Sequence, residues 1–239
     1  MRQNSYPEIF ISTLANQHIP EPYLCEMVTI KTFPFNPFYE NTYVLSDETG
    51  ECIIIDPGCH NEEECEELKN YIEKNRLKPV KLLNTHCHVD HVFGNPYVAD
   101  TWKLQLEINP HDRVVLESFP KVCEMYNFPV KNLQPEPLAS LEEGKQVKFG
   151  HTTLEIFFTP GHSPGSVSFY NAKEKFVIGG DVLFQGSIGR SDLPGGDYET
   201  LIRSIKEKLL VLPEDVTVYS GHGNPTKIGI EKRTNPFLI

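Results

Sequence analysis

This chain of 239 residues has no long hydrophobic run, no Cys-x-x-Cys pair and no extended cluster of basic residues. Without an apolar stretch of about 20 residues, no transmembrane helix is predicted. The apolar residues 9–15 follow Glu8 and precede no good small-residue cleavage site, so a secretory signal peptide is not expected either. These absences favour a cytoplasmic location.

The six cysteines are spread thinly through the sequence, and a chain of this length can bury a core without disulfides. We therefore predict reduced thiols at Cys25, Cys52, Cys59, Cys65, Cys87 and Cys123. Cys87 lies between two histidines, but the alternation of side chains along a strand should turn it to the opposite side, where it would serve as a small buried apolar group.

Positive charge is scarce: the chain has 33 acidic and 22 basic residues, which gives a formal net charge of −11. This balance disfavours binding to nucleic-acid backbones as the main activity and favours a small-molecule substrate. With 39% hydrophobic residues, the chain is expected to form a single domain over residues 1–239, with residues 1–25 as an N-terminal extension.

The most informative segment is Thr-His-Cys-His-Val-Asp-His, residues 85–91, which follows an apolar, strand-like run. His86 and His88 are two residues apart and would point the same way at a strand end, while a turn at Val89 could bring Asp90 and His91 to a neighbouring position. Zinc, iron and manganese accept imidazole and carboxylate donors, and two ions about 3.5–4 Å apart form a hydrolytic clamp. The segment predicts a metal site.

Three further candidate ligands each follow a short apolar strand. His162 lies in the tight turn Pro-Gly-His-Ser-Pro-Gly, Asp181 follows the segment Phe-Val-Ile-Gly-Gly, and His222 is flanked by glycines. Taken singly, each would be an ordinary loop or turn residue. Four groups of ligands at strand ends in one chain instead indicate a shared site.

The order of these motifs, His-x-His-x-Asp-His and then His, Asp and His, resembles that of the metallo-β-lactamase fold hydrolases. The resemblance spans roughly residues 28–237. It is narrowed to the compact glyoxalase II-like subgroup by residues 41–43, 55–58, 186–197 and 228–237.

This resemblance implies two divalent metal ions, zinc in the first place, with iron or manganese as alternatives. The first ion would be bound by His86, His88 and His162, the second by Asp90, His91 and His222, and both by Asp181. In lactam-cleaving members with two zinc ions a cysteine commonly replaces the bridging aspartate, so Asp181 argues against antibiotic hydrolysis. Asp56 would either hydrogen-bond a ligand histidine or serve as a turn residue.

The resemblance also implies hydrolysis of a thioester such as S-D-lactoylglutathione by a hydroxide that bridges the two metals. Asp90 could act catalytically by orienting that hydroxide and accepting its proton. Arg190 could contact a substrate carboxylate or could pair with Asp192 or Asp197. Glyoxalase II proteins carry a helical C-terminal domain with glutathione contacts, whereas this sequence ends soon after His222, which implies a different mode of thiol recognition.

Three alternatives stay open. A persulfide dioxygenase of the same superfamily would use one iron and also carries a Gly-Arg-x-Asp stretch, as in residues 189–192. A superfamily nuclease would need a recognition surface that an acidic chain does not offer. A scaffold without chemistry is disfavoured because every expected ligand is retained.

Hydrophobic patterns predict strands near residues 26–33, 42–47, 51–56, 103–108, 146–149, 152–159, 166–170, 175–178 and 216–220. Helices are predicted after Asn61, with Glu64 in capping-box relation, over residues 96–102 and 112–128, and after Asp197. Residues 129–137, with three prolines, suggest a linker between halves. The pattern alone gives mixed α and β structure. The resemblance implies a four-layer αβ/βα sandwich in which two mixed β-sheets pack face to face with helices outside.

Overall fold

The computed structural model describes residues 1, 27–130 and 132–239. Apart from Met1, the predicted N-terminal extension, including Cys25, lies outside the described residues. Two mixed six-stranded sheets form the centre of the molecule. The first contains, in spatial order, β1 (Thr29–Phe35), β2 (Glu40–Ser46), β3 (Glu51–Ile55), β4 (Lys78–Leu83), β5 (Leu106–Ile108) and β6 (Leu138–Ala139). The second contains β14 (Thr226–Lys227), β13 (Thr217–Ser220), β10 (Phe176–Gly180), β9 (Val167–Asn171), β8 (Thr152–Phe158) and β7 (Gln146–Phe149).

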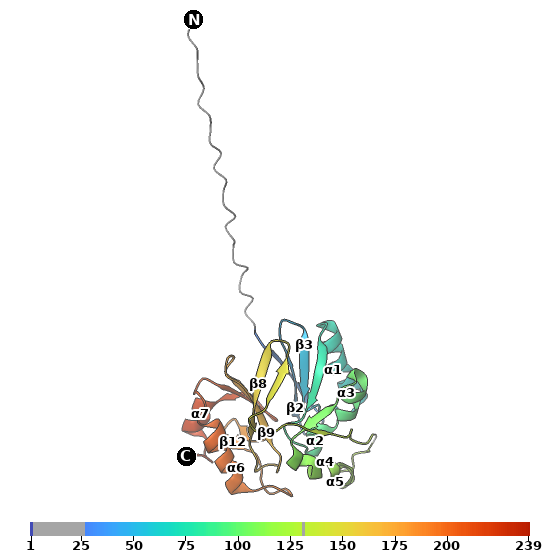
Figure 1. Ribbon diagram of the computed structural model, residues 1–239. Coiled ribbons are helices and arrows are strands. Elements are labelled where there is room, and N and C mark those ends of the chain that lie inside the picture. Colours follow the sequence, from blue (N-terminus) through green and yellow to red (C-terminus); the bar gives the residue numbers. More distant parts are fainter. Residues whose placement is uncertain (2–26, 131) are drawn as a thin grey trace.

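Helices cover the outer face of each sheet (Figure 1). The first sheet packs against α1 (Glu62–Lys74), α2 (Val89–Val92), α3 (Asn95–Trp102), α4 (Arg113–Glu117) and α5 (Phe119–Met125). The second packs against α6 (Tyr198–Ser204), the π-helical turn η2 (Ile205–Leu209) and α7 (Ile228–Thr234). A short hairpin, β11 (Leu183–Phe184) and β12 (Ser187–Ile188), completes the fold. The predicted four-layer αβ/βα sandwich is confirmed.

Because side chains alternate along a strand, β3 contributes residues to two apolar layers, one on each face of the first sheet. Ile53 and Ile55 of β3 contribute to the core between the two sheets, where Leu154 and Phe169 meet them from the second sheet. Ile54, between them, points to the opposite face and joins the core under α1 and α3. A strand buried on both faces reads as a continuous apolar run, as residues 52–55 do.

The predicted helix caps are present, with one difference. The side chain of Asn61 accepts a hydrogen bond from the backbone of Glu64 at 2.9 Å, and that of Asp197 accepts one from Thr200 at 2.7 Å. The Glu64 carboxylate accepts instead from the backbone of His60 and of Asn36, both at 2.9 Å. It therefore ties the start of α1 to the end of β1.

The single helix predicted over residues 112–128 is wrong. A 3₁₀ turn, η1 (Pro110–Asp112), leads into α4, and α5 begins only after Ser118. Pro120 lies in the first turn of α5 and has no N–H to continue the ladder from α4. The strand predicted over residues 103–108 begins only at Leu106. In the proline-rich segment, Gln134 donates a hydrogen bond to the Val92 carbonyl at 3.0 Å, which holds this connection against α2.

Among the described residues, no helix has the length and apolar character needed to cross a bilayer. The described cysteines form no disulfide, and Cys87 is buried, as predicted.

Candidate metal centre

The candidate metal centre lies where strands of both sheets end. Residues 85–91 follow β4 of the first sheet, while His162, Asp181 and His222 follow β8, β10 and β13 of the second. All seven predicted ligands come together there, although 136 residues separate His86 from His222 in the sequence. Candidate ligand atoms fall into groups within 4.8 Å of one another, including one of His86, His88 and His162 and one of Asp90, His91 and His222.

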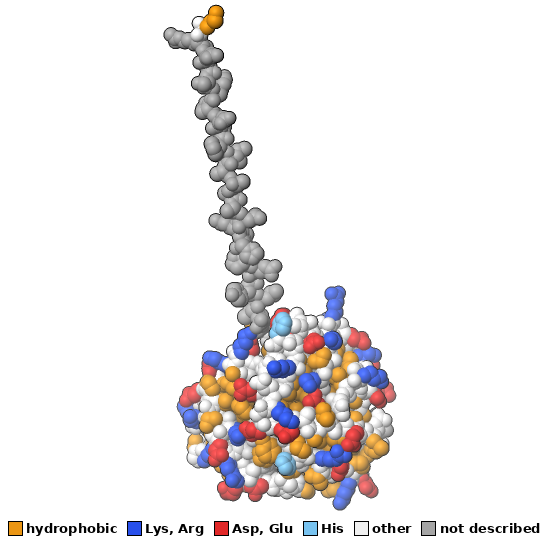
Figure 2. All heavy atoms as spheres, in the orientation of Figure 1, with side chains coloured by type: hydrophobic (Ala, Val, Ile, Leu, Met, Phe, Trp, Pro, Cys, Tyr) orange, Lys and Arg blue, Asp and Glu red, His pale blue; other side chains and the backbone are white. Residues whose placement is uncertain are grey.

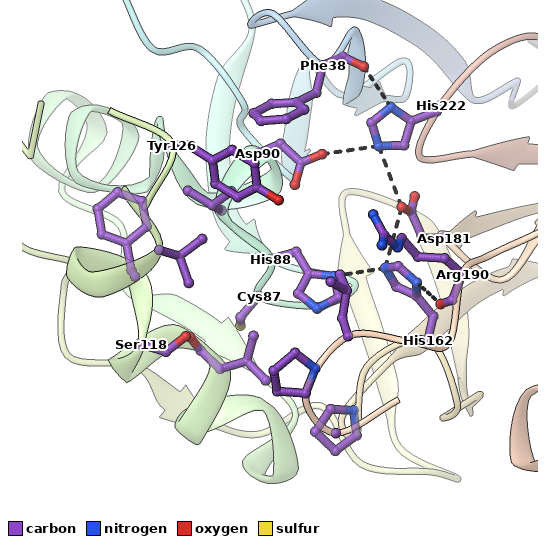
Figure 3. Close-up of a pocket in the computed structure, with 18 of the residues that line it drawn as sticks. Phe38, Cys87, His88, Asp90, Ser118, Tyr126, His162, Asp181, Arg190 and His222 are labelled. Atoms are coloured by element: carbon purple, nitrogen blue, oxygen red, sulfur yellow. Dashed lines mark hydrogen bonds and ion pairs between the residues drawn. The ribbon is translucent and has the colours of Figure 1, made fainter. Parts of the chain in front are cut away.

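The first group is formed by imidazole nitrogens alone. Nδ1 of His88 lies 2.8 Å from Nε2 of His162, and that atom lies 3.2 Å from Nε2 of His86. Figure 3 shows the rings of His88 and His162 directed toward each other. Three converging nitrogens are a usual protein contribution to a catalytic zinc site, whose fourth position is left for water or substrate.

Asp181 lies between this group and the second one. Its Oδ2 is 3.5 Å from Nε2 of both His162 and His222, and its Oδ1 is 3.6 Å from Nε2 of His91. The second group is closed by Asp90, whose Oδ2 lies 3.2 Å from Nε2 of His222. One carboxylate therefore faces both sets of donors.

Outer hydrogen bonds fix three of the imidazoles with Nε2 toward the centre. Nδ1 of His162 donates to the Arg190 carbonyl at 2.6 Å, and Nδ1 of His222 donates to the Phe38 carbonyl at 3.1 Å. Nδ1 of His91 lies 3.1 Å from Oδ2 of Asp56, so of the two roles that the sequence left open for Asp56, the contact with a candidate ligand histidine is present. Such partners orient the ring and leave the Nε2 lone pair for a metal.

Two buried atoms at the centre show that the donor set suits a cation. Nε2 of His91 and Oδ1 of Asp181 have no hydrogen-bond partner among the described residues. A buried polar atom without a partner costs about 1–3 kcal/mol, so native structures rarely leave one unexplained. A divalent cation between these two atoms would satisfy both.

The pKa shifts differ between the two groups of histidines. Burial lowers the pKa of His88 to about 3, with a further contribution from His162, and burial also lowers the pKa of His86 well below its usual range. Both rings are therefore neutral at pH 7, which is the form that binds metals. Burial would lower the pKa of His91 and of His222, but the carboxylates of Asp90 and Asp181 outweigh it and raise both, so a cation bound there would displace protons. Burial would raise the pKa of Asp181, but the neighbouring His91, His162 and His222 outweigh it and hold the pKa of that carboxyl below its usual range.

Asp112, which no sequence pattern singled out, joins the two histidine loops. Its buried carboxylate accepts hydrogen bonds from the Cys87 backbone at 2.6 Å, the Ser163 hydroxyl at 2.6 Å and the Gly165 backbone at 2.5 Å. These partners flank His86 and His88 in one loop and follow His162 in the other. This role cannot be predicted from the local sequence, because every hydrogen-bond partner of Asp112 lies at least 25 residues away from it in the chain.

The start of β2 includes residues 41–43, one of the segments that carry the family resemblance, and it is hydrogen-bonded to the loop that contains His222. The Asn41 amide donates to the carbonyls of Ser220 and Gly223 at 3.0 and 2.9 Å, and the Tyr43 hydroxyl donates to Ser220 at 2.6 Å. Residues 41–43 thus fasten the first sheet to the strand that carries His222.

A cavity of about 880 Å³ opens onto the centre. His88, Asp90, His162, Asp181 and His222 line one side, and side chains of α4 and α5 line the other (Figure 3). Arg190 also lines the cavity. Its guanidinium pairs with both carboxylate oxygens of Asp192 at 2.7 and 2.8 Å, the structural pairing that the sequence left open.

Comparison with known proteins agrees with this fold. Residues 35–222 match the metallo-beta-lactamase superfamily, and the chain belongs to that superfamily. With its cluster of histidine and aspartate donors, it is a metal-dependent hydrolase of this class.

Two bacterial relatives cover most of the chain. It is 38% identical over 213 residues to a protein of Haemophilus influenzae named hydroxyacylglutathione hydrolase GloC, which covers 88% of this chain and 98% of that protein. It is also 38% identical to the probable metallo-hydrolase YqgX of Bacillus subtilis, with 87% of this chain and 96% of the relative covered.

Solved structures show the same architecture. BLEG-1, described as a B3 metallo-beta-lactamase, is 39% identical with a TM-score of 0.79, covering 88% of this chain and 99% of its own. TTHA1623, solved in a di-iron-bound form, is 37% identical with a TM-score of 0.78, covering 88% of this chain and 100% of its own. ETHE1 from Myxococcus xanthus, 23% identical with a TM-score of 0.68, shares the fold.

Proposed function

We propose that this protein hydrolyses a thioester, such as S-D-lactoylglutathione, to a carboxylic acid and a thiol at a centre of two divalent cations. The observation that carries the proposal is the position of Asp181 between two donor sets. His86, His88 and His162 would hold one ion, Asp90, His91 and His222 the other, and Asp181 would bind both. The similarity to a relative named hydroxyacylglutathione hydrolase supports the choice of substrate.

The chain's own residues have defined tasks in this reaction. The two cations would supply Lewis acidity and a hydroxide nucleophile from water at neutral pH. Asp90, which lines the cavity, would orient the attacking group and accept its proton on the carboxylate. Asp56 and the carbonyls of Phe38 and Arg190 would keep the histidine rings fixed during turnover. A thiolate leaves without a strong general acid, so none is required of the cavity.

We propose zinc as the first candidate metal, since its preferred ligands are nitrogen and carboxylate oxygen. Iron is the second candidate, because TTHA1623 was solved in a di-iron-bound form. Imidazole and carboxylate donors suit either ion, so the donor types do not choose between them.

A second candidate function is β-lactam hydrolysis, which the name given to BLEG-1 favours. The candidate bridging residue here is an aspartate, whereas a cysteine is common at that position in two-zinc lactamases. A β-lactam is therefore included as a competing candidate substrate in the experiment described below.

We further propose that the substrate is a small molecule and that the protein acts in the cytoplasm. On the face shown in Figure 2, acidic and basic side chains are interspersed rather than gathered into one basic surface. The net charge of −11 adds a repulsion toward nucleic-acid phosphates.

The experiment compares three reactions on protein loaded with zinc or with iron. We expect S-D-lactoylglutathione to be hydrolysed, a β-lactam to be cleaved far more slowly, and glutathione persulfide to cause no oxygen uptake. Asp181→Ala should reduce thioester turnover at least a hundredfold while the circular dichroism spectrum stays unchanged. Oxygen uptake on persulfide with one iron per chain, or an active Asp181→Ala variant, would overturn the proposal.

A further inference from the structure

The wall of the cavity that faces the candidate metal centre is apolar. Helices α4 and α5 bury Leu116, Phe119 and Cys123 in the core under the first sheet, as expected for helices on a sheet. Val115 and Val122 pack against this core and also line the cavity, and the exposed Val114, Met125 and, just after α5, Tyr126 extend the apolar lining. A helix at a protein surface normally presents polar side chains to the solvent. Apolar side chains exposed in a cavity therefore indicate that the cavity binds an apolar group.

The exposure of this wall is large for apolar side chains. Val114 and Met125 are 65% and 71% exposed, and Tyr126 is 49% exposed. Tyr126 packs edge-on against Phe38 with ring centroids 5.7 Å apart, and the Phe38 carbonyl accepts the hydrogen bond from His222. The apolar wall is thus continuous with the residues that orient a candidate ligand.

Away from the candidate metal centre, the cavity has few partners for a negatively charged group. Among the described residues that line it, Arg190 is the only cationic side chain apart from histidines, and Asp192 already engages its guanidinium. The Ser118 hydroxyl on the apolar wall donates to the Val115 carbonyl at 2.7 Å and is also engaged. Carboxylates such as those of a glutathionyl group therefore find no unpaired lysine or arginine among the lining residues that the structure describes.

We propose that the wall formed by α4 and α5 binds an apolar acyl group of the thioester, and that recognition of the acyl group outweighs recognition of the thiol carrier. This inference rests on the proposed thioester hydrolysis and specifies its substrate class. The acyl side is assigned because common biological thiol carriers bear amide and anionic groups, so the apolar end of such a thioester is its acyl group. The carbonyl would lie at the histidine side, with the acyl chain extending toward Val114 and Met125.

The first test varies the acyl chain on a fixed, uncharged carrier. Thioesters of N-acetylcysteamine with acetyl to octanoyl groups should show kcat/KM rising roughly twofold to fourfold for each methylene that reaches the wall. Lactoyl thioesters of N-acetylcysteamine and of glutathione should differ by less than about fivefold. A flat acyl series, or a strong dependence on the glutathione carrier, would overturn the inference.

The second test changes the wall itself. Val114→Asn and Met125→Gln keep side-chain size while adding polarity, and each should lower kcat/KM for the octanoyl thioester about fivefold to tenfold while changing that for the acetyl thioester less than twofold. Val211→Asn is the matched control, because Val211 is 69% exposed and does not line the cavity. Equal losses on both substrates, or equal losses in the control, would refute the role of the wall.

Failure of this inference and failure of the proposed function give different results. If no thioester of either carrier is hydrolysed by the metal-loaded protein, thioester hydrolysis itself is wrong. If thioesters are hydrolysed without regard to acyl length, only the assignment of the wall is wrong.

Discussion

Gly221 has no side chain, and the space that a side chain would fill is occupied by the Asp181 carboxylate, which lies between the two sets of candidate ligands. A Cβ at this position would lie 2.1 Å from Oδ1 of Asp181 and 2.7 Å from Cε1 of His91, far inside van der Waals contact. We predict that Gly221→Ala displaces the carboxylate and weakens metal binding roughly tenfold to a hundredfold, as disruption of a ligand's support does elsewhere. The measurement is metal retained per chain during dialysis against a weak chelator.

Gly179→Ala provides the matched control, because its Cβ would meet its nearest neighbour, Cγ1 of Val218, at an ordinary 3.5 Å. This variant should keep the wild-type metal content. If Gly221→Ala also keeps it, the close packing around Asp181 has no bearing on metal binding.

Asp112 joins the two histidine loops without touching a candidate ligand side chain. Replacing it by Asn turns an amide N–H₂ toward donors that the carboxylate now satisfies, so Asp112→Asn should cost about 1–3 kcal/mol in unfolding free energy. Because it acts as a positioning residue, metal affinity should also fall about tenfold. Denaturation and metal titration measure the two effects separately.

The exposed Asp100 supplies the control for this change. Asp100→Asn should alter neither quantity. An Asp112→Asn variant that loses stability but binds metal as tightly as the wild type would show that Asp112 serves the fold alone.

Side chains with local signals were predictable, and those with distant partners were not. The seven candidate ligands could be predicted because each follows a strand and because residues 85–91 concentrate four of them. Asp112 and the carbonyls of Phe38 and Arg190 act through partners far away in sequence, and a carbonyl carries no residue signature. The convergence of the seven is observed, and their roles as ligands stay predictions.

Among the structural elements, the turn between β2 and β3 shows how one carboxylate connects two hairpins. Asp47 accepts hydrogen bonds from the Thr49 backbone at 3.1 Å, from the His151 backbone at 2.7 Å and from the Thr152 hydroxyl at 3.0 Å. Burial would raise the pKa of Asp47, but the Thr49 hydroxyl, which donates at 2.5 Å, and these other donors outweigh burial and hold its pKa below the usual range. The contact joins the first sheet to the β7–β8 hairpin of the second.

This shift has a defined effect on stability. A carboxyl whose folded-state pKa is lowered adds stability above its unfolded pKa of about 3.9, and this contribution is lost as the pH falls through the lower folded value. Asp47→Asn should therefore lower the unfolding free energy by about 1–3 kcal/mol at pH 7 and by progressively less below about pH 4. Urea denaturation across this range measures it, and a difference that does not change with pH would contradict the assignment.

Helix boundaries were predictable where a side chain marks them. Asn61 and Asp197 cap their helices as the sequence indicates. The break between α4 and α5 was missed because apolar periodicity runs through residues 112–128, although Pro120 lies inside that segment. Periodicity identified the apolar side chains of this segment but did not reveal that some of them line a cavity.

In the molecule as a whole, the centre joins the two sheets, so metal binding should stabilise the entire fold. Ligands from the end of β4 and from the ends of β8, β10 and β13 would be linked through the ions. A metal in thousandfold excess over its dissociation constant adds about 4.1 kcal/mol. Removal should then lower Tm by roughly 8–16 °C for a chain of this size.

The measurement is calorimetry of the metal-loaded protein before and after treatment with a chelator, with metal added back to restore the original Tm. An unchanged Tm, with metal content shown to fall, would mean that the ions do not connect the halves of the fold.

The layer order itself could not be derived from periodicity, which gives only mixed α and β structure. The continuous apolar runs of β3 and β10 indicate burial on both faces, but which sheet covers which face depends on contacts between distant strands such as β2 and β13. The motif order supplied that information through its resemblance to a known superfamily.

The central claim is that Asp181 bridges two metal ions, and anomalous diffraction from crystals of the metal-loaded protein tests it most directly. We predict two anomalous peaks per chain, one among His86, His88 and His162 and one among Asp90, His91 and His222, with a carboxylate oxygen of Asp181 bound at each. A single peak, or two peaks without contact to Asp181, would contradict the account.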